Sequence, residues 1–365
     1  MSLLTINTFV IIVFSFVCVK GMPKTSNEDS LVLVHTIFRH GDRTPDSPGY
    51  ANNPINESFF PEGYGQLTKE GKRTEYRLGT TLRKRYNHFL GQTWNINYLE
   101  ARSTNFNRTK MSLQLVLAAL YPPRDYQVWF RNLDWQPIPY NVFENDEEFL
   151  FFLCKKYTTE LDKTQNSNDI RAAISIYDDV FKYLSEKTGE SFSSAFQVFS
   201  LYFSLLTQKE YGYPLEDWVI PIWPDVFVRI AVDNYYILTN TTSLKQGSGG
   251  ALLKKILRDS RAKIKGTISP SDLKMYLYSG HDLNIATMLL TLGVFDEKIP
   301  SYGSHILFEL HLVNGVYGFK IFHQDWSTEY PRLLTIPGCT AFCPFDQFEA
   351  LVADVIPQDG FCSSL

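Results

Sequence analysis

The 365-residue chain has no excess of basic residues and no repeated or low-complexity segment. It contains 35 lysines and arginines against 39 aspartates and glutamates, which gives a formal net charge of −4. Nucleic-acid-binding proteins are usually basic, so we expect no nucleic-acid partner. The hydrophobic share of 44% and the charged share of 20% are ordinary for a globular protein. The chain can therefore form a sizeable core, as one large domain or two medium ones.

The apolar run at the N-terminus is too short to cross a membrane. It covers residues 9–19, whereas a membrane-spanning helix needs about 20 apolar residues. The length fits a signal peptide over residues 1–21, with small residues before a cleavage site near Gly21. Residues 2–8 contain no Lys or Arg, so a signal anchor is the alternative. The chain ends without a second apolar run. We therefore expect no membrane anchor and a secreted or lysosomal protein.

Cysteines are few, and their number agrees with this compartment. One of the five, Cys18, would leave with the signal peptide. An even number then remains, which predicts disulfides in an oxidising compartment, although spacing does not choose among the three pairings. A single C-x3-C pair lacks the ligand spacing of a zinc site, so no metal is predicted. The four are Cys154, Cys339, Cys343 and Cys362. Three sequons are candidate glycosylation sites: Asn56, Asn107 and Asn240.

The first part of the chain alternates strand and helix patterns. Residues 31–38 are rich in Leu, Val and Ile, as is typical of a strand buried on both faces of a sheet. Apolar residues at helical spacing predict a helix over 68–90. A second strand is expected at 97–104, followed by a helix over 108–121 that two prolines end.

The rest of the chain divides into a helical stretch and a second α/β stretch. Residues 274–280 predict another buried strand, and 283–293 the helix after it. Asn314-Gly315 lies between two strand-like runs over 306–322, which is a strong hairpin signal. Within 144–265 the helical patterns fall at 144–161, 169–187, 192–209 and 249–264.

These patterns predict an α/β protein. We expect a mixed, mostly parallel sheet flanked by helices, with a helical insertion lobe and an antiparallel pair at one edge of the sheet. The predicted segments are a signal peptide at 1–21, a first part of the α/β core at 22–143, the helical lobe at 144–265 and a second part of the core at 266–365.

Arginine, histidine and aspartate residues lie at or just after the ends of three of the predicted strands. In open α/β sheets ligands bind beyond the carboxyl ends of the strands, so three separate junctions can converge on one crevice. Three arginines, two histidines and one aspartate would meet there. They are Arg39, His40 and Arg43 at the first junction, Arg102 at the second, and His281 and Asp282 at the third.

That combination of side chains suits phosphate. Arginine is permanently charged and offers paired N–H donors to phosphate oxygens. Several arginines can hold these oxygens while charge moves during phosphoryl transfer. A neutral imidazole can attack phosphorus, and a nearby carboxylic acid can protonate the leaving group. Because the arginines neutralise the charge, we expect no cofactor.

Three motifs carry a family resemblance: "RHGDRTP" at 39–45, "RSTNFNRTKMS" at 102–112 and "SGHDLN" at 279–284. In this order they resemble the histidine acid phosphatases, a branch of the histidine phosphatase superfamily. The resemblance spans nearly the whole mature chain and is strongest to secreted animal enzymes, insect venom acid phosphatases among them. It implies the phosphoglycerate mutase-like fold and a secreted enzyme that hydrolyses small-molecule phosphomonoesters through a phosphohistidine intermediate.

The resemblance also implies roles for individual residues. His40 matches the nucleophile and Asp282 the proton donor. Phosphate contacts are implied for Arg39, Arg43, Arg102 and His281. The implied disulfides are Cys154–Cys362 and Cys339–Cys343.

Other interpretations stay open. Asp282 can also cap the following helix, Arg102 can be a salt-bridge partner, and Arg108 and Asp42 are expected to be structural. The chain as a whole can be a secreted or venom binding protein on the same fold, or a phytase-like enzyme. A phytase needs a strongly basic pocket, which the net charge of −4 does not favour. The oligomeric state is open, with a homodimer among the alternatives.

Overall fold

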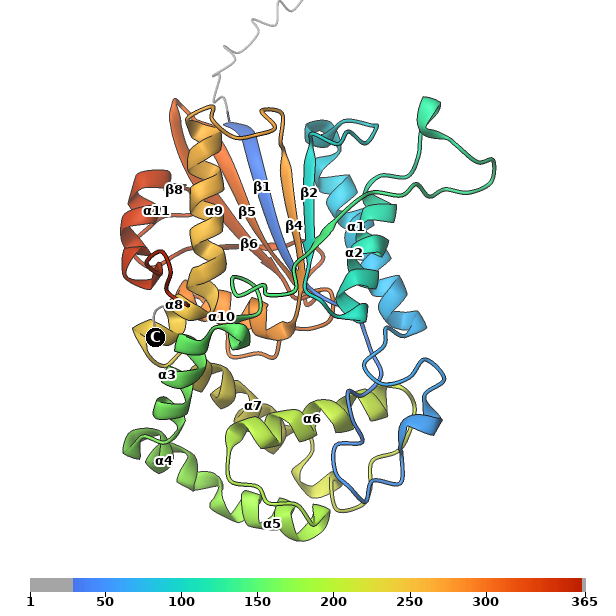
Figure 1. Ribbon diagram of the computed structural model, residues 1–365, viewed down its shortest axis with the longest axis vertical. Coiled ribbons are helices and arrows are strands. Elements are labelled where there is room, and N and C mark those ends of the chain that lie inside the picture. The colour runs from blue at the N-terminus through green and yellow to red at the C-terminus, as the bar shows by residue number, and fades with distance from the viewer. Residues whose placement is uncertain (1–28, 363–365) are drawn as a thin grey trace, which may run out of the picture.

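A mixed sheet of eight strands forms the centre of the molecule, for which the computed structural model describes residues 29–362 (Figure 1). The strand order is β3-β2-β4-β1-β5-β6-β7, with β8 pairing with β6 as well. The first four strands in that order run parallel, and the others join antiparallel. The strands are β1 (Asp29–Arg39), β2 (Leu99–Ser103), β3 (Asn141–Val142), β4 (Met275–Gly280), β5 (His305–Val313), β6 (Val316–Gln324), β7 (Arg332–Leu334) and β8 (Cys343–Pro344).

Helices cover both faces of this sheet, as the apolar run in β1 predicts. Leu33 and Ile37 share a core with α9 (Gly249–Ile264), α10 (Asp282–Thr291) and α11 (Phe345–Leu351). Val34 and Phe38 face the other way, toward α1 (Lys69–Leu90) and α2 (Asn107–Leu120). Successive strand residues point to opposite faces, so one strand serves two apolar layers. The predicted fold class is confirmed.

A helical lobe lies beyond the carboxyl ends of the parallel strands (Figure 1). Its helices share a separate apolar core rich in Phe and Tyr. They are α3 (Lys155–Gln165), α4 (Asn168–Ile174), α5 (Asp178–Thr188), α6 (Ala195–Glu210), α7 (Asp225–Leu238) and α8 (Thr242–Gly247). Short 3₁₀ turns complete the described part of the chain: Glu57–Phe59, Asp125–Gln127, Phe151–Leu153, Ser175–Tyr177, Ile220–Ile222 and Ala353–Val355.

Several helices of this region differ from the sequence pattern. The helix expected from residue 144 begins only at Lys155, and the one over 169–187 is split into α4 and α5. Helices α7 and α8 were not predicted. Helix α9 packs on the sheet through Leu252, Leu253 and Ile256. We therefore propose that the lobe ends before α9 and that this helix belongs to the α/β core, earlier than the boundary expected at residue 265.

The hairpin forms as predicted but is not the edge of the sheet. Asn314 and Gly315 both have positive φ angles, 50° and 81°, as a two-residue type I′ turn requires. Outside the hairpin, β7 and β8 both pair with β6. Both short strands lack a periodic pattern long enough to be predicted.

Two disulfides are formed, in the pairing that the family resemblance implies. Cys154 at the start of α3 bonds to Cys362 near the C-terminus, and Cys339 bonds to Cys343. The three sequon asparagines are exposed, and their glycosylation stays a prediction. The predicted signal peptide and Cys18 lie outside the described residues. Within 29–362, no helix has the length and apolar character to cross a membrane.

Candidate active site

A pocket of about 340 Å³ opens between the carboxyl ends of the strands and the helical lobe. Its polar wall combines residues after β1, after β4 and at the start of α2, and its apolar wall comes largely from the lobe. The ionisable side chains that line it are His40, Arg43, Asp46, Arg108, His281 and Asp282. The apolar wall includes Phe152, Phe196, Phe199 and Phe203. Of the six predicted site residues, four line this pocket.

His40 is held in one tautomer. Its Nδ1 lies 2.7 Å from the carbonyl oxygen of Gly41, and because a carbonyl only accepts, Nδ1 carries the proton. Nε2 then keeps its lone pair and accepts a hydrogen bond of 3.2 Å from Arg108 Nε. Burial, followed by the charges of Arg108 and other arginines, holds the pKa of His40 well below its usual value. The imidazole is therefore a neutral nucleophile even in acid.

The loop that carries His40 is packed against the start of α1. A Cβ atom on Gly41 would lie 2.4 Å from the carbonyl oxygen of Gly71, so only glycine fits this close approach. Asp42 stabilises the same contact. Its backbone carbonyl accepts a hydrogen bond from Thr68 N–H at 3.0 Å, and its carboxylate accepts one from the Thr74 hydroxyl at 2.8 Å. The path of the loop thus depends on this close backbone contact, and Asp42 holds it through hydrogen bonds to Thr68 and Thr74.

Arg43 lines the pocket and Arg39 lies beside it. Arg43 pairs with Asp46 at 2.9 Å and donates to Thr44 O. Arg39 is only 2% exposed and stacks 4.0 Å over the ring of Tyr302. In both arginines the buried Nε has no hydrogen-bond partner among the residues the structure describes. A buried donor without a partner requires an explanation, and a bound anion supplies one.

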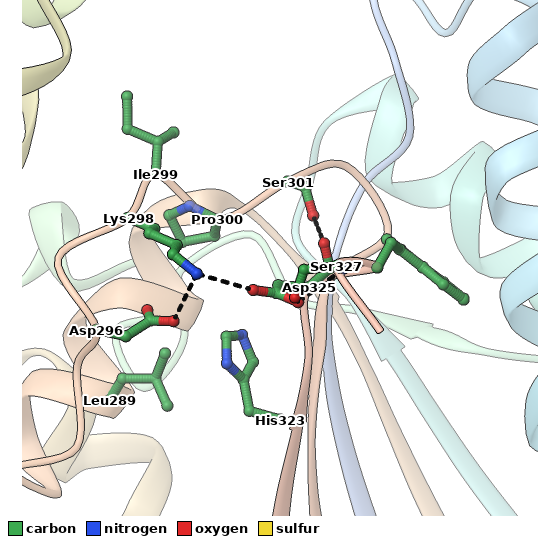
Figure 2. A pocket seen from close by; sticks show the side chains of 10 residues that line it. Leu289, Asp296, Lys298, Ile299, Pro300, Ser301, His323, Asp325 and Ser327 are labelled. Atoms are coloured by element: carbon green, nitrogen blue, oxygen red, sulfur yellow. Dashed lines mark hydrogen bonds and ion pairs between the residues drawn. The ribbon is translucent and has the colours of Figure 1, made fainter. Parts of the chain in front are cut away.

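The loop that contains Pro300 contacts Asp325, just after β6, through Lys298 and Ser301 (Figure 2). Arg39 donates to the carbonyl of Pro300, which also lines a second pocket of about 310 Å³. In that pocket Lys298 lies between two carboxylates, 3.7 Å from Asp296 and 3.8 Å from Asp325. Ser301 donates to Asp325 O at 2.8 Å. These contacts fix the loop and so the position of Arg39.

Arg102 is not part of the pocket, which corrects its predicted phosphate-binding role. Its Nε donates to Asp146 at 2.7 Å, its Nη1 donates to Glu148 at 2.9 Å, and its Nη2 contacts Asp146 as well. The reason is the alternation of the strand. Ala101 faces the core shared with α1 and α2, so Arg102 points to the other face. There its donors are engaged by carboxylates.

Arg108 takes the place at the pocket instead, although it was expected to be structural. It lies in the first turn of α2, and it also pairs with Asp46 at 3.1 Å. Burial, opposed by Asp46, lowers the pKa of Arg108 to about 10, so it stays charged in acid and at neutrality. A sequence signal was available. A cation at a helix N-terminus opposes the helix dipole, and anions bind at such termini.

His281 and Asp282 enter from the junction between β4 and α10. His281 Nε2 lies 3.1 Å from Thr104 Oγ1, and its ring meets His40 edge-on at 5.5 Å. Burial and then the arginine charges hold the pKa of His281 well below its usual value. Asp282 is the first residue of α10, where the helix dipole favours a carboxylate. Its Oδ2 accepts a hydrogen bond of 2.6 Å from Tyr235.

Tyr235 is a second contact that the sequence did not indicate. It lies on α7, one of the helices that were not predicted, 47 residues before Asp282. Within the described range, no group of three or more His, Cys, Asp or Glu side chains is placed to hold a metal ion.

Comparison with known proteins agrees with this geometry. The model of the histidine phosphatase superfamily (branch 2) matches residues 30–324. The chain belongs to this family. Among curated relatives, the venom acid phosphatase of Apis mellifera is 37% identical over 90% of this chain and 86% of its own. The prostatic acid phosphatase of Homo sapiens is 30% identical over 95% and 91%. The family inferred from the three motifs is confirmed.

Solved structures support the fold of this histidine phosphatase. The apo phytase of Hafnia alvei superposes with a TM-score of 0.69 and 17% identity, covering 92% of this chain and 98% of its own. At this identity the likeness concerns the fold alone. It agrees with the mixed sheet flanked by helices.

Proposed function

We propose that this protein is an acid phosphatase that hydrolyses phosphate monoesters through a phosphohistidine intermediate. The observation that carries the proposal is the tautomer of His40, whose unprotonated Nε2 faces a pocket lined by arginines. A positively charged pocket binds the phosphate dianion, and a neutral imidazole within it can attack phosphorus. The relatives named as acid phosphatases support the same activity.

Arg39, Arg43 and Arg108 hold the phosphate in this proposal. Their charges offset those of the phosphate oxygens, and the unpartnered Nε groups of Arg39 and Arg43 gain acceptors. His281 contributes a further contact from its edge-on position beside His40. Because these groups are already in place, little reorganisation is needed as charge shifts in the transition state.

The reaction then proceeds in two balanced steps. In the first, His40 Nε2 forms a bond to phosphorus while the bond from phosphorus to the ester oxygen breaks. That oxygen takes the electron pair and a proton from Asp282. In the second, water attacks the phosphohistidine and the Asp282 carboxylate accepts a proton from the water. The N–P bond breaks, and phosphate leaves a neutral His40 and a protonated Asp282.

The apolar wall favours monoesters with an apolar or aromatic leaving group over a phytase-like substrate. Phe152 and Phe196 are 39% and 44% exposed at the pocket. An inositol ring that carries several phosphates needs cations in these places. A binding protein without activity is also disfavoured, since it has no use for a neutral nucleophile beside a buried acid.

We further propose that the protein is secreted or lysosomal. The predicted signal peptide at 1–21, the two disulfides and the exposed sequons support this, as do relatives named as venom and lysosomal acid phosphatases.

The deciding experiment is a panel of phosphomonoesters offered to the purified protein across pH, together with the His40→Ala variant. We expect hydrolysis with an acidic optimum, trapped phosphate on His40 of the wild type after rapid quenching, and no turnover by the variant. The variant should melt near the wild-type temperature. Near-normal hydrolysis by folded His40→Ala would refute the phosphohistidine mechanism.

A further inference from the structure

The hydrogen bond between Tyr235 and Asp282 joins the helical lobe to the proposed proton donor. Asp282 lines the pocket but is only 9% exposed. Its Oδ2 accepts from Tyr235 at 2.6 Å, whereas Oδ1 accepts no hydrogen bond from any residue that the structure describes. The two carboxyl oxygens therefore have different surroundings.

Tyr235 is a fixed donor. It is fully buried, with its ring edge-on to Phe199 at 5.5 Å and to Phe295 at 6.0 Å. Burial and the neighbouring Asp282 raise the pKa of its phenol well above the usual value, so the hydroxyl keeps its proton. Among the described residues that hydroxyl has no second acceptor, so its proton points to Oδ2.

We propose that Tyr235 is a positioning residue that places the acidic proton of Asp282 on Oδ1, the oxygen left for the leaving group. This inference rests on the proposed function. A neutral carboxyl has one proton, and an Oδ2 that already accepts from a phenol is a poor site for it. The proton on Oδ1 then passes to the departing ester oxygen, and Tyr235 stabilises the carboxylate that remains.

The other charged groups that act on Asp282 do not change over the working range. Arg39 and Arg108 both interact with it electrostatically, and both arginines remain charged in acid. His40 and His281 are buried and held neutral. Tyr235 is therefore the neighbour through which a single substitution can change the carboxyl group without changing the charge of the site.

The chain supplies a matched control on the same helix. Tyr236 follows Tyr235 on α7, but it is 39% exposed and donates to Glu297 at 3.1 Å. Tyr235→Phe and Tyr236→Phe each remove one hydroxyl and one hydrogen bond to a carboxylate. Only the first concerns the pocket.

The experiment measures kcat and KM against pH for both variants on two esters. Glycerol 2-phosphate has an alkoxide leaving group that needs a proton, and 4-nitrophenyl phosphate has an acidic phenol that does not. For Tyr235→Phe we expect kcat on the alkyl ester to fall by about 10- to 100-fold. This factor corresponds to the free energy that a hydrogen bond to a charged group contributes. The aryl ester should change by less than about threefold. Tyr236→Phe should match the wild type on both.

Two further measurements separate positioning from a general loss of structure. In an Asp282→Asn background, Tyr235→Phe should cause no additional loss, since there is no acid left to position. In the single variant the falling limb of the pH profile should move to higher pH, because the carboxylate has lost a donor. If Tyr235→Phe fails to fold, 3-fluorotyrosine at this position keeps the ring and donates more strongly. It should move the limb to lower pH.

The outcomes distinguish this inference from the proposed function. Suppose that the wild type is active. The role of Tyr235 alone is then overturned if folded Tyr235→Phe loses equal activity on both esters, or if 3-fluorotyrosine leaves the falling limb of the pH profile where it is in the wild type. A wild type that hydrolyses neither ester overturns the proposed function, and the role of Tyr235 with it.

Discussion

Arg108 donates a hydrogen bond from its Nε to His40 Nε2, 68 residues away in sequence, at 3.2 Å. The contact places a guanidinium on the lone pair that the proposed mechanism uses. A phosphate in the pocket competes for both groups, since it accepts from the arginine and receives the attack of the imidazole. The first turn of α2 thereby becomes part of the site, while Arg102, six residues earlier, does not.

This difference predicts opposite behaviour for two arginines of one motif. Arg108→Met removes a donor from the pocket, so kcat/KM should fall by about 100-fold or more, with a melting temperature close to that of the wild type. Arg102→Met leaves the buried Asp146 without its partner, which should cost about 3–5 kcal/mol of unfolding free energy. Its kcat should stay within about threefold of the wild type in the folded protein, because Arg102 does not line the pocket.

Denaturant unfolding and steady-state kinetics on the same preparations check both halves of this prediction. The control is the double variant Arg102→Met/Asp146→Leu, which removes the ion pair as a whole and should recover much of the lost stability. A large fall in kcat for stable Arg102→Met would return that residue to the active site.

The two arginines also show where the sequence was sufficient and where it was not. The strands and helices next to the three motifs have clear apolar or helical patterns, so β1, α2, β4 and α10 could be predicted. Which arginine reaches the pocket depends on the exact end of β2, because one residue along a strand exchanges its two faces. Strand ends are the part of a periodic pattern that sequence defines least well.

Long-range packing explains the remaining differences. The periodicity of α9 predicts a helix but does not say whether its apolar stripe meets the lobe or the sheet. Tyr235 could not be assigned to the site, because its contact with Asp282 depends on how α7 packs against α10. By contrast, the family resemblance implied both disulfide pairs, although cysteine spacing alone does not choose among the three possible pairings.

The two disulfides should differ strongly in their contribution to stability. Cys154 and Cys362 are separated by 208 positions, and Cys339 and Cys343 by 4. In the chain-entropy model the disulfide that closes the long loop stabilises the folded state by about 5 kcal/mol, and the one that closes the short loop by about 2 kcal/mol. Cys154→Ser/Cys362→Ser should therefore lower the melting temperature much more than Cys339→Ser/Cys343→Ser. Equal losses would show that native-state effects outweigh loop entropy.

Acid should destabilise the fold through histidines that are buried neutral. Burial lowers the pKa of His305 to about 4, against about 6.5 in an unfolded chain. Between these values the unfolded state binds a proton that the folded state does not, so stability falls as pH drops from 6.5 to 4. The contribution of His305 is at most on the order of 3 kcal/mol.

The variant His305→Phe tests this pH dependence. It keeps a ring against Trp326 and removes the titrating group. Its unfolding free energy should fall less steeply with pH than that of the wild type over this window. His88→Phe, at an exposed position on α1, is the control and should keep the wild-type slope. If His305→Phe keeps the full slope as well, His305 is not a source of the acid sensitivity.

The phenylalanine wall should set the preference among leaving groups. Phe196 is 44% exposed, lines the pocket and lies nearly parallel to the ring of Phe199 at 6.2 Å. An aromatic leaving group can pack against it, and such a contact is worth about 0.5–1.5 kcal/mol. Phe196→Ser should therefore lower kcat/KM for 4-nitrophenyl phosphate by about 2- to 10-fold, and leave glycerol 2-phosphate nearly unchanged. Ile220→Ser removes an exposed apolar side chain that does not line this pocket, and should affect neither ester.

Inositol hexakisphosphate should be a poor substrate of the wild type, because phenylalanines occupy the wall where its further phosphates would need cations. Efficient hydrolysis of that compound, with no effect of Phe196→Ser on the aryl ester, would instead favour the phytase-like alternative.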